Sequence, residues 1–498
     1  MLCATRMMVK FQLRRMKMRR RQTVYVFMAM LLVLGLIGFT PGAGKAYAAT
    51  LYEVGPGKTY ANIGDVPWES LNAGDQVKIY WRSTPYKEKI VISRMGTAAA
   101  PITVTGVPNA SGQRPVIDGN GATTRAALDF WNDNRSVIKI GGARFSGSAS
   151  DPSTGNLPKY ITIENLEIRG AKQSYTYKNN AGTTVSYLKA ASPIFVEYGE
   201  NLTFRNNVIT DGGNGLFVAS TDAGVSRNIL VEGNYIYGNG NSGSVYEHNI
   251  YTAAVGITFQ YNRLGDLCSG CTGNNLKDRS SGTVIRYNWI EGGNRQLDLV
   301  EGDDTTVISG DANYHKTYVY GNVLIKPNDT RNPQFVHYGG DNGTTSLYRK
   351  GTLYLYNNTF ISNRATSATL LRLSTSSETA DVRNNVFYKS VSGSTLNIID
   401  QTGTANLYNN WINTGYVNNA SGSGGTVTHS GTITGTSPGF TNFSMLDLRP
   451  ATGSALINAG TSLSTGASSY PVNMEYVKDQ SSIARAVHST IDIGAFEN

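Results

Sequence analysis

Residues 201–209 read NLTFRNNVI, a phrase in which apolar and polar residues alternate before an asparagine and a further apolar pair. From residue 201 onward the phrase returns every 25–35 residues. Alternation of period two is typical of a β-strand, and self-similarity at this spacing is typical of a solenoid. The related phrases are YITIENLEI (160–168), NILVEGNYI (228–236), GITFQYNRL (256–264), GTVIRYNWI (282–290), TYVYGNVLI (317–325), TLYLYNNTF (352–360), ADVRNNVFY (380–388) and ANLYNNWIN (405–413).

The repeat predicts an all-β protein built as a single-domain right-handed parallel β-helix over residues 50–498. A β-propeller is the alternative, but its blades hold four strands in about 40 residues, whereas these phrases supply two or three. A short helical stretch around residues 66–71 follows a Gly-Pro turn and is expected to form an N-terminal cap, because a solenoid must hide its terminal strand edges.

The recurring asparagines have two structural explanations. Asparagine tolerates a positive φ better than most residues, which suits the bend between two short strands. Asparagines stacked in successive coils can also hydrogen-bond to one another along the solenoid axis.

Residues 1–49 are expected to be a secretory signal peptide. A basic stretch ends at Arg21, an apolar run of 16 residues follows at 24–39, and AYAA at 46–49 offers small residues for cleavage. The alternative is an uncleaved membrane anchor, although the run is shorter than the roughly 20 residues that a spanning helix needs. We therefore expect a secreted, extracellular protein, which after cleavage is monomeric and free of the membrane.

The net charge of +9 belongs to this leader. Nine of the 44 Lys and Arg residues and none of the 35 Asp and Glu residues fall within 1–49, which leaves 35 of each sign in the remainder. The sequence therefore does not predict a nucleic-acid partner. Cys268 and Cys271 form a CxxC pair in Gly- and Ser-rich sequence, for which a loop disulfide is favoured over a redox-active pair.

A second strand follows each asparagine phrase, and aligning these strands on their inward apolar residue predicts a column of outward side chains. The column runs Phe217, Tyr251, Lys277, Asp298, then Val336 or His337 depending on register, then Arg372. Asn249 and Arg279 lie two residues from column members, so they are expected on the same face. Such a ladder of polar groups is also compatible with a merely solubilising surface.

The column holds the groups that proton abstraction beside a carboxylate requires. A cation neutralises the acid group, a base removes the proton, and an acid protonates the leaving oxygen. We expect Lys277 and Arg279 to lower the pKa of the Tyr251 hydroxyl, and we expect these cations to form a local basic patch that attracts an acidic polymer.

The order HNIY (248–251), a YN strand, NLKDR (275–279), another YN strand and DIGAFE (492–497) resembles secreted β-helix polysaccharide lyases. The likeness is to the alginate lyases of polysaccharide lyase family 31 and, more distantly, to the alginate and dermatan lyases of family 6. It implies cleavage of a uronate polymer, alginate above all, by β-elimination, with Lys277 acting together with Tyr251 or Arg279.

The sequence departs from family 6 at two points. That family binds calcium through acidic residues ahead of the lysine, but no glutamate precedes Lys277 in NNLKD. We therefore expect no metal and no cofactor, and nothing in the sequence supports a calcium site. The family 6 arginine also lacks a counterpart, since the matching strand LDLVEG (297–302) offers Asp298 and Glu301 instead.

The predicted site is accordingly a set of catalytic and substrate-binding residues. The catalytic residues are Tyr251, Lys277, Arg279 and His248. The residues expected to bind the acidic polysaccharide are Asn249, Asn275, Arg295, Asp298, Glu301, His337, Tyr338 and Arg372.

Two other functions remain open from the sequence. A glycoside hydrolase on the same fold would use a pair of carboxylates from Asp298, Glu301, Asp303 and Asp304. A non-catalytic glycan-binding protein would use tyrosine, tryptophan and asparagine, but the 29 tyrosines cannot decide this because Tyr is an ordinary strand residue.

Overall fold

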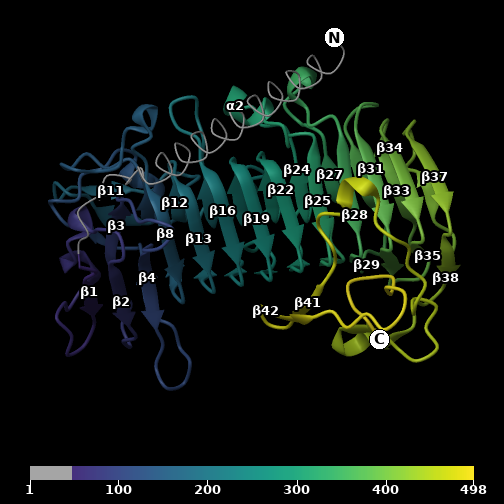
Figure 1. The fold of residues 1–498 in the computed structure, drawn as a ribbon, viewed down its shortest axis with the longest axis horizontal. Coiled ribbons are helices and arrows are strands. Elements are labelled where there is room, and N and C mark those ends of the chain that lie inside the picture. Colours follow the sequence, from purple (N-terminus) through teal and green to yellow (C-terminus); the bar gives the residue numbers. More distant parts are fainter. Residues whose placement is uncertain (1–47) are drawn as a thin grey trace, which may run out of the picture. The chain divides into compact units, whose positions relative to one another are not determined.

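The computed structural model describes residues 48–498, so the predicted signal peptide lies almost wholly outside the described residues. The described part is a right-handed parallel β-helix in which three parallel sheets of 13, 14 and 11 strands run side by side (Figure 1). Among residues 48–498, no helix is long and apolar enough to cross a membrane.

The repeated phrases form consecutive strands of the 13-stranded sheet, which confirms the solenoid prediction. This sheet begins with β1 (Leu51–Val54), β2 (Gln76–Tyr80) and β4 (Ile102–Val107) and ends with β37 (Thr426–Ser430). Its strands from the repeats are β8 (Lys159–Glu164), β13 (Glu200–Arg205), β16 (Arg227–Glu232), β19 (Val255–Gln260), β22 (Ser281–Arg286), β25 (Lys316–Tyr320), β28 (Thr352–Tyr356), β31 (Thr379–Arg383) and β34 (Thr404–Tyr408).

The apolar pair after each asparagine lies in a strand of the 11-stranded sheet. Its strands in spatial order are β5 (Val116–Asp118), β9 (Glu167–Arg169), β14 (Val208–Ile209), β17 (Tyr235–Ile236), β20 (Arg263–Leu264), β23 (Trp289–Glu291), β26 (Val323–Lys326), β29 (Thr359–Ser362), β32 (Val386–Lys389), β35 (Trp411–Asn413) and β38 (Ile433–Gly435).

The 14-stranded sheet carries the outward column. Its strands in spatial order are β11 (Thr184–Ser186), β10 (Thr176–Lys178), β6 (Thr123–Thr124), β3 (Glu88–Ile92), β7 (Ser136–Ile140), β12 (Ser192–Val196), β15 (Leu216–Val218), β18 (Ile250–Thr252), β21 (Leu276–Asp278), β24 (Leu297–Leu299), β27 (Gln334–Tyr338), β30 (Ala368–Leu373), β33 (Leu396–Gln401) and β36 (Val417–Asn419). All its pairings are parallel except that of β10 with β11.

Inward side chains of all three sheets make one continuous core. Isoleucine, leucine, valine and phenylalanine from successive coils pack in rows, as Leu202, Ile229 and Ile257 illustrate. Because each coil buries its apolar face only against its neighbours, the fold is stabilised by stacking from coil to coil.

The two roles proposed for asparagine fall on adjacent residues. The first adopts a positive φ at the bend, as Asn206 does at 51° and Asn384 at 56°. The second is buried, and its side-chain amide donates to the amide oxygen of the corresponding asparagine in the next coil, as Asn322 does to Asn358 at 2.9 Å. This ladder runs through Asn207, Asn234, Asn262, Asn288, Asn322, Asn358, Asn385 and Asn410.

Breaking the ladder at its centre is expected to destabilise the fold. The Asn322 amide also donates to the carbonyl oxygens of Ile285 and Tyr320, so Asn322→Leu strands several buried polar groups. We expect the free energy of unfolding to fall by about 2–5 kcal/mol in urea denaturation. Asn120→Ala, at an exposed position, should change it by less than about 0.5 kcal/mol. Equal stability of the two variants would contradict a structural role for the ladder.

The predicted N-terminal cap lies where it was expected, but it is not an α-helix. The expected helical stretch is two 3₁₀ turns, Ile63–Asp65 and Trp68–Ser70, which pack against β3 around the fully buried Trp68. Among the described residues, the one α-helix is the single turn α2 (Thr306–Ser309).

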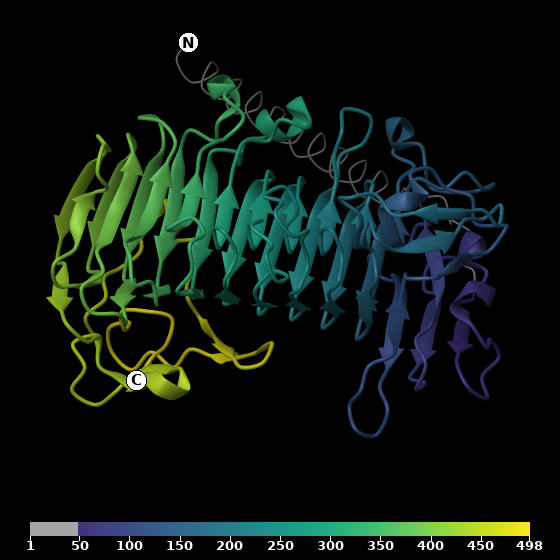
Figure 2. The ribbon, with the colours of Figure 1, turned by 180° about the vertical axis from the view of Figure 1, so that it is seen from behind.

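The C-terminal segment folds back along the solenoid after β38 (Figure 2). It contains the hairpins β39–β40 (Phe440–Asn442, Asp447–Pro450) and β41–β42 (Met474–Val477, Ser481–Ala484). Leu448, Tyr476 and Phe496 pack on Trp289 and Ile361, so this segment covers outward apolar residues of the 11-stranded sheet. It leaves the column on the 14-stranded sheet free.

Candidate active site

The strand register places the predicted outward column as expected. Tyr251 pairs with Lys277, Lys277 with Asp298, Asp298 with His337, and His337 with Arg372. The open choice between Val336 and His337 is thereby settled in favour of His337. Phe217 precedes Tyr251 in the column, and the two rings stack with centroids 4.8 Å apart.

A cleft of about 620 Å³ opens over this column. Strand residues Phe217, Tyr251, Lys277 and Asp298 form its floor. Residues that precede the strands line one edge, namely Ala190, Asn214, Val245, Tyr246, His248, Asn274, Asn294 and Arg295; residues that follow the strands line the other, namely Arg279, Asp304 and Asp341.

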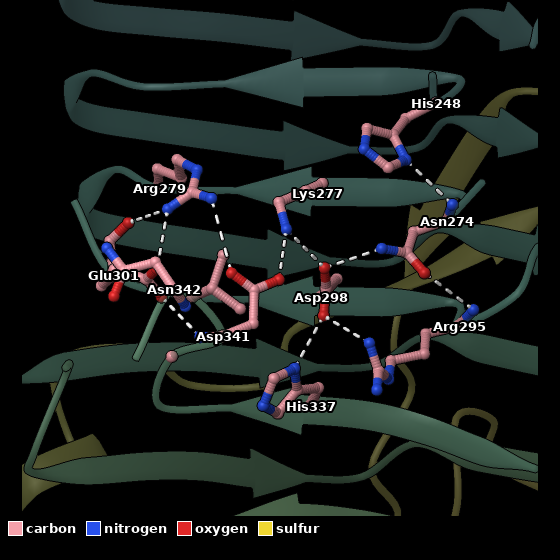
Figure 3. Close-up of polar contacts among 12 residues, drawn as sticks. His248, Asn274, Lys277, Arg279, Arg295, Asp298, Glu301, His337, Asp341 and Asn342 are labelled. Carbon is pink, nitrogen blue, oxygen red and sulfur yellow. Dashed lines mark hydrogen bonds and ion pairs between the residues drawn. The ribbon is translucent and has the colours of Figure 1, made fainter. Parts of the chain in front are cut away.

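Lys277 lies at the centre of an ion-pair network (Figure 3). Its Nζ is 3.1 Å from Asp298 Oδ2 and 2.6 Å from Asp341 Oδ2. Burial alone would lower the pKa of Lys277, but the two carboxylates outweigh it, and the pKa is raised above its ordinary value. Lys277 is therefore a cation at neutral pH.

Asp298 is fully buried and anchors the network from below. Oδ1 accepts from His337 Nδ1 at 2.8 Å and from Arg295 at 3.2 Å, and Oδ2 accepts from Asn274 at 2.7 Å. Burial favours the protonated acid, yet Lys277, His337 and Arg295 hold the pKa of Asp298 well below its usual range. Asp298 is therefore an anion that holds Lys277 in position, and it does not act as a proton donor.

Arg279 organises the other half of the site. Its Nε donates to Tyr251 Oη at 2.8 Å, and its Nη1 donates to Asp303 Oδ1 at 2.8 Å. Nη2 lies 3.5 Å from Asp341 Oδ1. One carboxylate, that of Asp341, thus bridges Lys277 and Arg279.

Tyr251 has a higher pKa than the sequence suggested. Burial raises the pKa of its hydroxyl, and this effect exceeds the lowering by the charges of Arg279 and Lys277. The expectation of a lowered pKa was wrong because alternation shows which cations are near but not how deeply the phenol lies.

His248 is a neutral hydrogen-bond donor. Its Nδ1 accepts the backbone N–H of Asn274 at 2.9 Å, so the ring proton is on Nε2, which has no hydrogen-bond partner among residues 48–498. The ring stacks on Tyr251 with centroids 5.6 Å apart. Burial, with Lys277 nearby, lowers the pKa of His248 to about 3.

The depressed pKa makes stability depend on pH. Between pH 6.5 and 3 the unfolded chain binds a proton at His248 and the folded chain does not, so acid favours unfolding. We expect His248 to remove about 2 kcal/mol of stability between pH 7 and pH 5. In His248→Gln, whose side-chain oxygen can still accept from Asn274, urea denaturation should show a correspondingly smaller loss. An unchanged loss would contradict a neutral His248.

Several predicted substrate contacts prove to be structural. Asn249 and Asn275 precede their strands and turn inward, where the Asn249 amide donates to Asn275 Oδ1 at 3.0 Å in a second, fully buried asparagine ladder. Tyr338 alternates into the core and is fully buried. All three were expected to bind substrate, but their side chains are buried and do not line the cleft.

Three further residues do not meet the cleft as predicted. Glu301 is buried, and its carboxylate accepts the backbone N–H groups of Asp341 at 2.8 Å and Asn342 at 3.0 Å. His337 is buried between Asp298 and Ser374. Arg372 lies outside the cleft, 3.8 Å from Asp400.

The basic patch expected at Lys277 is also absent from the described structure. The cleft and its immediate shell combine Lys277, Arg279 and Arg295 with five carboxylates, those of Asp298, Glu301, Asp303, Asp304 and Asp341. The cations are specific hydrogen-bond donors within an acidic frame, so they recognise a carboxylate by geometry and not by long-range attraction.

Asn274, Asp341 and Tyr246 were missed by the sequence reasoning. Asp341 belongs to a GGDNG loop (339–343) that directly follows β27, and the corresponding position after β24 holds the GDD of residues 302–304. Aligning residues beyond strand ends could have found Asp341. The CxxC prediction is confirmed, since Cys268 and Cys271 form a disulfide.

Among the described residues, no group of three or more His, Cys, Asp or Glu side chains has the arrangement of a metal site.

Comparison with known proteins gives distant structural likenesses. No protein-family model matches the chain, and no curated protein matches it in sequence. It aligns with pectate lyase Pel9A at 14% identity and a TM-score of 0.43, over 91% of this chain and 98% of that one. It aligns with an alginate lyase from Paenibacillus sp. str. FPU-7 at 13% identity and 0.34, over 74% and 94% of the two chains.

A lacto-N-biosidase from Eubacterium ramulus aligns at 14% identity with a TM-score of 0.37, over 77% of this chain and 68% of that one. A PL6 family alginate lyase aligns at 14% identity with a TM-score of 0.38, over 72% of this chain and 51% of that one. At these scores the likenesses carry no argument about chemistry, and the fold rests on the strand pairings above. The resemblance to family 31 stays a prediction.

Proposed function

We propose that this protein is a secreted, monomeric polysaccharide lyase that cleaves a uronate-containing polymer, with alginate as the first candidate, by β-elimination. The observation that carries the proposal is the bridging of Lys277 and Arg279 by one carboxylate, beside a phenol whose oxygen Arg279 holds. A uronate carboxylate in the place of Asp341 would meet the same two cations.

Each side chain then has a defined task. Lys277 and Arg279 neutralise the uronate carboxylate, which acidifies the proton on the adjacent carbon. Tyr251, as the phenolate stabilised by Arg279, removes that proton; the carbon–oxygen bond to the leaving sugar breaks as the C=C bond forms. Tyr251 then returns the proton to the leaving oxygen, so that no water is consumed. The Nε2–H of His248 is free to donate to a substrate oxygen.

The absorbance of the product tests the proposal. The purified protein should generate the ultraviolet absorbance of an unsaturated uronate with at least one of alginate, polygalacturonate and hyaluronan. Failure to raise the absorbance with all three would contradict it. Secretion is supported by the Cys268–Cys271 disulfide, which suits an oxidising compartment.

A glycoside hydrolase is the second candidate, and one observation favours it. Burial raises the pKa of Asp304, whereas Lys277 holds the pKa of Asp341 below its ordinary value despite burial. Two carboxyl groups whose pKa values are pushed apart are typical of an acid and a base in hydrolysis.

Asp341→Asn separates the two functions. In the lyase, Asp341 competes with the substrate carboxylate for Lys277 and Arg279, so its neutralisation should lower KM several-fold and preserve kcat. In the hydrolase, the same change removes the base and should reduce kcat by about 10²–10⁴-fold. Steady-state kinetics on the preferred polymer distinguish the two, with Asp381→Asn, in the 13-stranded sheet, as a control outside the cleft.

A further inference from the structure

A loop at residues 241–247 presents two apolar side chains to the cleft. Val245 is 49% exposed and Tyr246 is 77% exposed, the highest value among large apolar side chains in residues 48–498. Both line the cleft over the column. A tyrosine ring left in water inside a substrate cleft offers an apolar face to a ligand and a hydroxyl at its edge.

The backbone of this loop is fixed on both sides. Gly243 N–H donates to the Gly270 carbonyl at 2.9 Å, and Thr272 Oγ1 donates to the Ser244 carbonyl at 3.0 Å. Gly270 lies within the loop closed by the Cys268–Cys271 disulfide, and Thr272 directly follows that loop. From the other side, Lys189 Nζ donates to Ser244 Oγ at 3.1 Å. The loop is therefore a braced platform for Tyr246.

The position of the platform defines what it meets. The loop precedes β18 and lies at the edge of the cleft that holds Asn274 and Arg295, whereas Arg279 and Asp341 lie at the opposite edge. A polymer with one carboxylate on Lys277 and Arg279 would cross the floor over Tyr251 and bring a neighbouring sugar to the platform.

We propose that Tyr246 forms a sugar subsite, in which its ring stacks on the apolar C–H face of a pyranose one or more residues from the uronate at Lys277. The position of that uronate rests on the proposed function, but the stacking itself does not depend on cleavage of the polymer. The subsite binds the pyranose ring of an acidic polysaccharide. The loop disulfide keeps the Tyr246 side chain in place without touching the ligand.

The test compares Tyr246→Ala with Tyr246→Phe, which keeps the ring, and with Met445→Ala, which removes a side chain that is 75% exposed and does not line the cleft. Retardation in native gels containing alginate, polygalacturonate or hyaluronan reports binding, and initial rates report turnover. For Tyr246→Ala we expect about five- to tenfold weaker retardation and a matching rise in KM, with a much smaller change in kcat. The other two variants should bind like the wild type.

The two proposals fail in different ways. If the wild type is retarded but forms no unsaturated product, the elimination is wrong, and the comparison of variants still tests the subsite. Equal retardation of Tyr246→Ala and the wild type would overturn the subsite, as would a wild type that none of the three polymers retards.

Discussion

Tyr251→Phe is expected to lower kcat by about 10²–10⁴-fold, because it removes the hydroxyl that transfers the proton in the proposed elimination. The ring remains, so the stacking on Phe217 and His248 is preserved, and Arg279 keeps its bonds to Asp303 and the Glu301 carbonyl. Polymer binding and the melting temperature should therefore change little. Tyr237→Phe, whose ring stacks on Tyr235 and does not line the cleft, is the matched control.

The same assignment sets the pH dependence of turnover. Since burial raises the pKa of Tyr251, the active phenolate is a minor species at neutral pH, and kcat/KM should rise about tenfold per pH unit from pH 7 to pH 9. A profile that is flat over this range would contradict Tyr251 as the base.

Lys277→Met is expected to be the second large loss, with kcat reduced by about 10²–10³-fold, because a fixed cation at the reacting carboxylate is lost. The change also leaves the buried Asp298 without its closest cation, so the free energy of unfolding should fall by about 3 kcal/mol.

A second substitution separates catalysis from stability. The double variant Lys277→Met/Asp298→Asn removes both charges and should regain stability without regaining turnover. Lys277→Arg should keep measurable turnover, because a cation is retained. Complete loss in Lys277→Arg would instead indicate that the Lys277 amine takes the proton itself, and recovered turnover in the double variant would exclude a role for its charge.

The sequence was most informative for the outward column, whose side chains lie within strands. Alternation placed Tyr251, Lys277, Asp298 and Arg372 in one column, because the strands of a parallel β-helix stack in register. The asparagine phrases likewise predicted both the bends and the ladder. These features repeat from coil to coil, so one sequence contains many copies of the same pattern.

Prediction was less successful beyond the strand ends. β18 and β21 are only three residues long, so alternation carried over to Asn249 and Asn275 no longer applied, and both turn into the core. The same extrapolation was right for Arg279, which points into the cleft. Short strands thus limit how far a face can be assigned from spacing.

Loops and burial account for the rest. Asp341 and Tyr246 reach the cleft from loops whose paths depend on backbone hydrogen bonds. The Glu301 carboxylate, for example, accepts the backbone N–H groups of Asp341 and Asn342. The sign of the Tyr251 pKa shift depends on burial, which becomes visible only when the coils are assembled. Neither is encoded in residue spacing.

Cleavage in water enriched in the heavy isotope of oxygen tests the central claim most directly. The purified protein is incubated with alginate, polygalacturonate or hyaluronan. The masses of the oligosaccharide products are measured by mass spectrometry, and their ultraviolet absorbance is recorded. Elimination predicts unsaturated products that absorb and carry no heavy oxygen from the cleavage step. Saturated products, each with one heavy oxygen at the new end and without absorbance, would contradict the account and identify the site as that of a hydrolase.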